Sequence, residues 1–126
     1  MTAAEAAARS GDTRFAFGAN WTAFLSVLNE DRIAAAEQSL KTMLDVPSLD
    51  GRTFLDVGSG SGLFSLAAVR LGAIRVHSFD CDPQSVACGR ELKRRFCPDA
   101  RHWTIEQGSA LDEPYVERLG HWDVVY

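Results

Sequence analysis

The feature that most limits how this chain can fold is a glycine-rich run from Asp56 to Gly62, with the sequence DVGSGSG. The preceding residues, 53–57, have the mostly apolar composition of a parallel strand that is buried on both faces. A helix is expected over residues 63–71, ended by Gly72. Glycine permits a tight turn at this junction, and the N–H groups that begin the helix offer partial positive charge to an anion. The run therefore predicts a ligand-binding loop rather than a flexible linker.

The alternation of strand and helix continues on both sides of this loop. Further strands are expected at residues 74–80, 102–107 and 122–126, and further helices at residues 31–44 and 83–96. Asp31 is expected to cap the first of these helices, and Asp82 the second, with Pro83 in its first turn. Strands that alternate with helices predict an α/β fold with a parallel sheet and right-handed crossovers.

Two well-known phosphate-binding loops fit the glycine run poorly. The nicotinamide fingerprint matches at Gly58 and Gly60, but its third small residue is replaced by Leu63. A P-loop requires a lysine, and none lies in or near the run. Asp56 is unfavourable beside a pyrophosphate but suits a ligand with an ammonium group. The amino-acid end of S-adenosylmethionine carries such a group.

The sequence resembles class I S-adenosylmethionine-dependent methyltransferases, whose first motif, Asp/Glu-x-Gly-x-Gly-x-Gly, is matched from Asp56 to Gly62. The resemblance spans about residues 50–126, and residues 14–25 also resemble the N-terminal segment of some bacterial members. It implies a Rossmann-like parallel sheet with flanking helices and strand order 3-2-1-4, truncated after the fourth strand. Residues 1–14 are expected to be flexible, and residues 15–126 to form a partial methyltransferase domain whose C-terminal half is missing.

The resemblance assigns part of the cofactor site to the glycine loop. Asp56 is expected near the methionine amino group, directly or through water, and Gly58, Ser59 and Gly60 let the cofactor lie against the backbone. Trp21 has two open interpretations. It either closes over the methionine end of the cofactor or packs beneath the sheet.

The remaining site residues follow the second and third strands. Asp80 stands 18 positions after Gly62, close to the spacing of about 20 at which an acidic residue reaches a ribose. The resemblance assigns the ribose to Asp80, in a solvent-facing position, and an adenine-side contact to Cys81. It assigns adenine to the Ser109 hydroxyl and the Ala110 N–H, although Ser109 replaces the usual Asp. Two alternatives stay open: Asp80 is a loop or capping acid, and the segment at Ser109 is an ordinary turn that ends the strand.

Composition argues against several other classes of protein. The net charge of −4 provides no general attraction for nucleic acid or an anionic membrane. No apolar run approaches the roughly 20 residues of a membrane span, and residues 1–10 lack the apolar core of a secretory signal, so a cytoplasmic protein is expected. The three cysteines lack Cys-x-x-Cys spacing, and the three histidines lack metal-ligand spacing, so no metal site is expected.

The predicted function is methyl transfer from S-adenosylmethionine to a small-molecule or biosynthetic acceptor. The reaction is a direct displacement, which mainly requires alignment of the reacting atoms and exclusion of water. No catalytic residue is assigned, and the isolated chain is expected to be an inactive fragment. Two alternatives stay open: a non-catalytic S-adenosylmethionine-binding module, and an NAD(P)-binding oxidoreductase, which Leu63 and Asp56 disfavour.

Overall fold

A computed structural model describes residues 2–3 and 21–126, so most of the expected flexible segment 1–14 and residues 15–20 lie outside the described residues. The elements are α2 (Trp21–Val27), α3 (Glu30–Leu44), β1 (Thr53–Val57), α4 (Leu63–Arg70), β2 (Arg75–Asp80), α5 (Pro83–Phe96), β3 (Trp103–Gln107), α6 (Glu113–Leu119) and β4 (Val124–Val125). Among the described residues, none of the helices has the length and apolar character that crossing a membrane requires.

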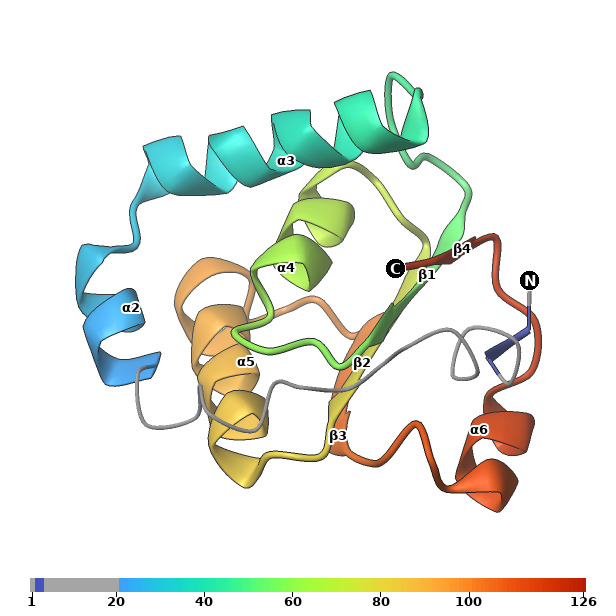
Figure 1. Cartoon of the computed structure of the whole chain (residues 1–126). Coiled ribbons are helices and arrows are strands. Elements are labelled where there is room, and N and C mark those ends of the chain that lie inside the picture. Colours follow the sequence, from blue (N-terminus) through green and yellow to red (C-terminus); the bar gives the residue numbers. More distant parts are fainter. Residues whose placement is uncertain (1, 4–20) are drawn as a thin grey trace.

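The strands form one parallel sheet in the order β3-β2-β1-β4, which confirms the predicted Rossmann-like topology (Figure 1). The fourth strand is shorter than the predicted residues 122–126. Its pairing with β1 is nevertheless continued by Tyr126, whose N–H donates to the Leu55 carbonyl at 2.8 Å. The Tyr126 carbonyl in turn accepts from the Val57 N–H at 3.1 Å. All four strands therefore direct their carboxyl ends toward the same edge of the sheet.

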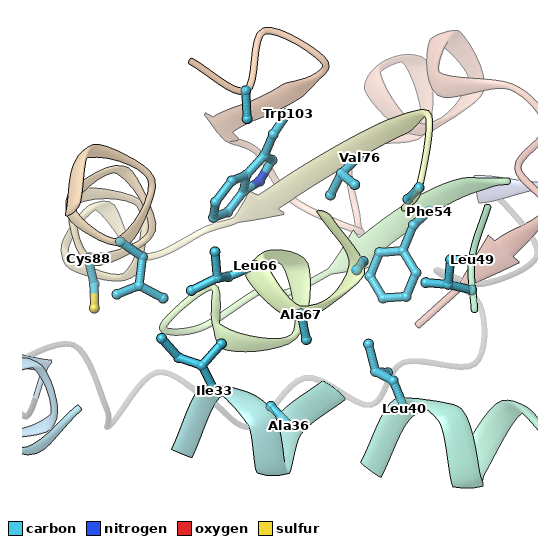
Figure 2. Packing of buried hydrophobic residues seen from close by; sticks show 14 residues of the cluster. Ile33, Ala36, Leu40, Leu49, Phe54, Leu66, Ala67, Val76, Cys88 and Trp103 are labelled. Carbon is cyan, nitrogen blue, oxygen red and sulfur yellow. The ribbon is translucent and has the colours of Figure 1, made fainter. Parts of the chain in front are cut away.

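Helices cover the two faces of the sheet unequally. On one face, α4 lies between the sheet and α3, and α5 lies beside it (Figure 1). Figure 2 shows Ile33 and Leu40 of α3 directed toward α4 and toward Phe54 of β1, while Trp103 extends from β3. Burial of each such large side chain contributes about 1.5–3 kcal/mol. This larger apolar cluster fixes the end of the glycine loop, because α4, which packs in the cluster, begins where the loop ends.

The opposite face is covered by α6, which lies between the predicted third and fourth strands. Asp112 caps this helix by accepting from the Tyr115 N–H at 3.3 Å. Tyr115, Val116 and Trp122 pack with Phe79 of β2 in a second, smaller cluster. The apolar spacing in a seven-residue helix is too brief to be recognised reliably in the sequence.

The ends of the longer helices correct one prediction and confirm another. The cap of α3 is Asn29, whose Oδ1 accepts from the Arg32 N–H at 2.9 Å, so the assignment of Asp31 as the cap is wrong by two residues. Asp31 instead lies in the first turn, where a carboxylate favours the helix dipole. At α5 the prediction is confirmed, since Asp82 accepts from the Gln84 N–H at 3.0 Å.

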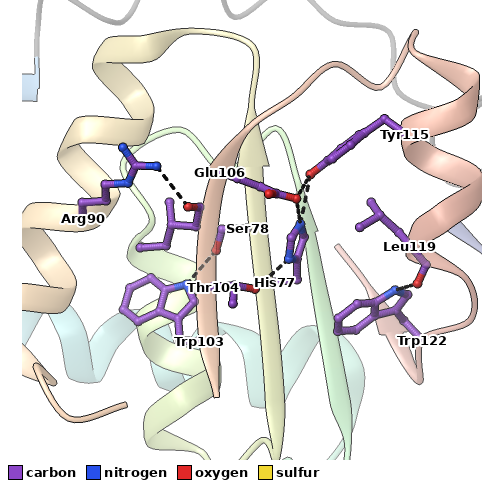
Figure 3. A network of polar contacts seen from close by, with 10 residues as sticks. His77, Ser78, Arg90, Trp103, Thr104, Glu106, Tyr115, Leu119 and Trp122 are labelled. Atoms are coloured by element: carbon purple, nitrogen blue, oxygen red, sulfur yellow. Dashed lines mark hydrogen bonds and ion pairs between the residues drawn. The ribbon is translucent and has the colours of Figure 1, made fainter. Parts of the chain in front are cut away.

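Side chains of α5 reach the outer strand of the described sheet. Lys93 Nζ donates to the Trp103 carbonyl at 2.7 Å. Arg90 donates to the Ile105 carbonyl at 3.4 Å (Figure 3). These carbonyls belong to alternate residues of β3. The helix is thereby attached to the strand beneath it by polar contacts as well as by apolar packing.

Candidate functional site

The predicted cofactor residues gather at the carboxyl edge of the sheet, where parallel α/β folds bind ligands. Backbone hydrogen bonds join the three segments. The Ser59 N–H donates to the Phe79 carbonyl at 2.9 Å, and the Gly108 N–H donates to the Asp80 carbonyl at 3.0 Å. The structure therefore places the loops that follow β1, β2 and β3 side by side.

The glycine loop has the tight backbone that its composition predicts. Gly62 has φ of +85°, and a Cβ atom at this position would lie 3.0 Å from the Cα of Gly89 on α5. Gly60 has φ of +56°, and a Cβ atom there would point toward the Trp21 ring at 3.5 Å. A side chain at Gly62 would therefore press the start of α4 against α5.

Asp80 joins the loop after β1 to the loop after β2 through hydrogen bonds. Its Oδ2 accepts from the Gly60 N–H at 2.9 Å, and its Oδ1 accepts from the Asp82 N–H at 2.9 Å. Only 4% of the residue is exposed, so the expectation of a solvent-facing position is wrong. The reason is that the loop after β1 folds over the end of β2 and uses this carboxylate as an acceptor. Ribose binding by Asp80 stays a prediction.

Asp56 is also buried, and one of its carboxylate oxygens contacts α4. Its Oδ2 accepts from the Ser65 hydroxyl at 2.7 Å. Ser65 lies 2.5 Å from the Ser78 hydroxyl, which accepts from Trp103 Nε1 at 2.8 Å. The sequence reasoning missed Ser65, its partner Ser78, and Trp103. The available signal was two serines at core-facing positions of otherwise apolar segments.

Two aromatic residues flank the loop. Trp21 places its ring beside Gly60, and its Nε1 donates to the Ser85 hydroxyl at 2.8 Å. The ring thus lies beside the loop and also packs against the larger apolar cluster, so both interpretations stay open. Tyr126 lies against Phe64 with ring centroids 5.0 Å apart. Burial is the larger cause of a raised pKa at Tyr126, and the negative charge of Asp56 adds to it.

The three remaining predicted residues lie at the ends of β2 and β3. Cys81 is exposed, and its carbonyl accepts from Gln107 Nε2 at 3.2 Å. The Ser109 hydroxyl accepts from the Leu111 N–H at 3.1 Å, as in an ordinary polar turn. Ala110 packs against the smaller apolar cluster. The structure brings these residues to the edge expected of an adenine site, and their contacts with adenine stay a prediction.

A second polar group connects α6 to the sheet, away from the loop (Figure 3). The Tyr115 hydroxyl donates to Glu106 at 2.7 Å and lies 3.0 Å from His77 Nε2, while His77 Nδ1 lies 2.7 Å from the Thr104 hydroxyl. Because the Tyr115 hydrogen is directed at Glu106, the Nε2–H tautomer of His77 satisfies all these contacts. Burial lowers the pKa of His77. These contacts give His77 a structural role, in which it joins β3 and α6 across the sheet.

A sequence model of the ribosomal protein L11 methyltransferases (PrmA) matches residues 35–102, more than half of the chain and all of the segment from α4 to α5. The chain belongs to this family. It is 42% identical over 71 residues to a ribosomal protein L11 methyltransferase of Yersinia pestis, covering 56% of this chain and 23% of that protein. It is 44% identical over 52 residues to one of Tolumonas auensis, covering 41% and 18%. The chain thus matches less than a quarter of the length of these relatives.

Solved structures share the fold at low sequence identity. A conserved hypothetical protein of Streptococcus pyogenes aligns with a TM-score of 0.60 and 21% identity, covering 71% of this chain and 54% of that one. An S-adenosylmethionine-dependent methyltransferase of Aquifex aeolicus aligns with a TM-score of 0.52 and 17% identity, covering 71% and 47%. These structures confirm the predicted Rossmann-like methyltransferase fold.

Family and fold together confirm the resemblance to class I S-adenosylmethionine-dependent methyltransferases. They also correct the predicted partner. The matching relatives are named for a ribosomal protein, so the expectation of a small-molecule substrate is wrong. That expectation had no support from acceptor-binding residues, since every residue assigned in the sequence concerned the cofactor.

Proposed function

We propose that the protein transfers the methyl group of S-adenosylmethionine to a ribosomal protein. The observation that carries the proposal is the pair of buried carboxylates, Asp56 and Asp80, held on either side of the loop from Gly58 to Gly62. Hydrogen bonds from the protein hold both carboxylates in place beside the loop. Two of them beside one loop fit a ligand that carries an ammonium group and two ribose hydroxyls.

The residues fit S-adenosylmethionine in a consistent order along the edge of the sheet. Asp56 would attract the methionine ammonium group, and Asp80 would accept from the ribose hydroxyls through the lone pairs that its two N–H donors leave. Cys81, Ser109 and Ala110 would lie along the adenine. This order follows the sequence of segments after β1, β2 and β3.

The loop itself would support the centre of the cofactor. Gly58, Ser59 and Gly60 present backbone without large side chains, and Asp80 holds the Gly60 N–H in place. When bound, S-adenosylmethionine supplies a methyl group on a positively charged sulfur. The protein's part is to orient that group and to exclude water. The Trp21 ring, beside Gly60, would shield this end of the site.

The protein acceptor is inferred from the names of the relatives. A cytoplasmic location belongs to the same proposal, because ribosomal proteins are made and assembled there. Within this proposal, residues 15–126 contribute a partial methyltransferase domain, as the sequence analysis expects.

Two measurements test the proposal. Titration calorimetry should show saturable binding of S-adenosylmethionine and of its demethylated product, and no binding of NAD. The protein translated from its native reading frame should then transfer labelled methyl groups from S-adenosylmethionine to ribosomal proteins of its own host. Binding of NAD alone would reject the cofactor assignment. Binding of S-adenosylmethionine with no labelled ribosomal protein would reject the acceptor and favour a non-catalytic binding module.

A further inference from the structure

A buried chain of side-chain hydrogen bonds runs across the α4 face of the sheet and ends at Asp56. It passes through Trp103 of β3, Ser78 of β2 and Ser65 of α4, with successive distances of 2.8, 2.5 and 2.7 Å. Figure 3 shows its first step, from Trp103 to Ser78. From Trp103 to Asp56, the four residues are 0%, 1%, 0% and 4% exposed. Four separate elements thus meet in one polar chain inside the larger apolar cluster.

The chemistry of its two ends gives the chain a direction. An indole N–H can only donate, and an ionised carboxylate can only accept. Each serine hydroxyl must therefore accept from the side of Trp103 and donate toward Asp56. If Asp56 were protonated and donated to Ser65, the Ser78 hydroxyl would receive two hydrogens and lose the acceptor for its own. The chain therefore favours the ionised form of Asp56.

The chain also fixes where the carboxylate lies. Asp56 and Ser78 are neighbours in the register of β1 and β2, and Ser65 bridges them from α4. Rotation of the Asp56 side chain would break the bond to Ser65 and leave a buried hydroxyl without its acceptor, which is unfavourable. Within the residues that the structure describes, every buried side-chain nitrogen and oxygen has a hydrogen-bond partner.

We propose that Ser65, Ser78 and Trp103 are positioning residues that keep Asp56 ionised and directed toward the methionine ammonium group of the cofactor. This inference rests on the proposed function, which assigns that group to Asp56. It adds three residues, from three other elements, to the determinants of cofactor affinity. A purely apolar packing of the same positions would fill the space but remove the hydrogen bond that Ser65 donates to the carboxylate.

The test compares two ligands that differ in the group of interest. S-adenosylmethionine carries the amino-acid end, whereas 5′-methylthioadenosine keeps the adenosine and a thioether but lacks it. Ser65→Ala should weaken binding of S-adenosylmethionine by roughly 10- to 100-fold, the range for loss of a hydrogen bond to a charged group. Its affinity for 5′-methylthioadenosine should stay within about twofold of the parent. Calorimetry with each ligand gives the ratio of the two affinities for the parent and for the variant.

Further variants separate positioning from packing. Trp103→Phe keeps an aromatic ring but removes the distant donor, so it should produce a smaller loss with the same ligand preference. In the Asp56→Asn background, Ser65→Ala should cause no additional loss, because the two residues act as a unit. Cys88→Ala is the matched control, since Cys88 is buried in the same apolar cluster but takes no part in the chain of hydrogen bonds. This variant should leave both affinities unchanged.

The outcomes distinguish this inference from the proposed function. If the parent binds 5′-methylthioadenosine but not S-adenosylmethionine, the proposed function fails and this inference with it. If the parent binds both, and Ser65→Ala and Trp103→Phe weaken both equally or neither, the proposed function stands and the positioning role is rejected.

Discussion

Replacing Asp80 with alanine is expected to loosen the glycine loop before any cofactor binds. The Asp80 carboxylate accepts from the Gly60 and Asp82 N–H groups, each at 2.9 Å, and only 4% of the residue is exposed. Alanine removes both acceptors. The loop after β1 and the residues that precede α5 then lose their common attachment.

The magnitude follows from those two bonds. A hydrogen bond to a charged group contributes about 1.5–3 kcal/mol. Water can replace part of this at the edge of the sheet, so we expect Asp80→Ala to reduce the free energy of unfolding by about 2–4 kcal/mol. For a domain of about 100 residues this lowers Tm by roughly 10–20 °C. Asp80→Asn keeps one carbonyl acceptor and should lose about half as much.

Thermal unfolding without cofactor provides the assay, and Asp123→Ala provides the control. Asp123 accepts from the Thr53 N–H at 2.8 Å and from its hydroxyl at 3.2 Å, but it is exposed and lies at the opposite edge of the sheet. Water can replace this carboxylate, so the control should melt close to the temperature of the parent. If Asp80→Ala melts at the temperature of the parent, the carboxylate does not hold the loop and the reasoning is refuted.

Two further predictions concern other parts of the chain. Gly62→Ala should destabilise the protein more than Gly51→Ala in urea unfolding, because the Cβ at residue 62 would lie 3.0 Å from the Cα of Gly89. At Gly51, nothing among the described residues lies within 4 Å of such a Cβ. The two glycines have similar φ angles, +85° and +75°, so equal losses of stability would disprove the contact. Burial lowers the pKa of His77 below its unfolded value of about 6.5, so its contribution to stability is complete above that pH and declines as the pH falls further. Urea unfolding between about pH 7 and 5 should therefore show a shallower pH dependence for His77→Gln, and an unchanged slope would contradict this.

Local signals in the sequence were sufficient for much of the fold. The limits of β1 and α5 are those predicted, because an apolar run precedes the glycine loop and because Asp82 and Pro83 mark the start of a helix. The start of α3 was harder to predict. Asn29 and Asp31 are both residue types that can cap a helix, so residue type alone does not choose between them.

The candidate site was predictable to the extent that it depends on the backbone. Glycine spacing identified the loop, and the ends of the strands located its neighbours. The partners of Asp56 were not predictable, because the contact with Ser65 depends on how α4 lies over the sheet. The place of Ser78 depends on the register that pairs it with Asp56. Neither is determined by the spacing of residues along the chain.

The contacts between α5 and β3 also affect how the sheet can associate with other chains. A strand that approached the outer side of β3 would need the carbonyls of Trp103 and Ile105 as acceptors, and Lys93 and Arg90 already donate to them. Such a strand would have to displace two cations, which makes pairing unfavourable. Misassembly through strand addition at the β3 side should therefore be disfavoured.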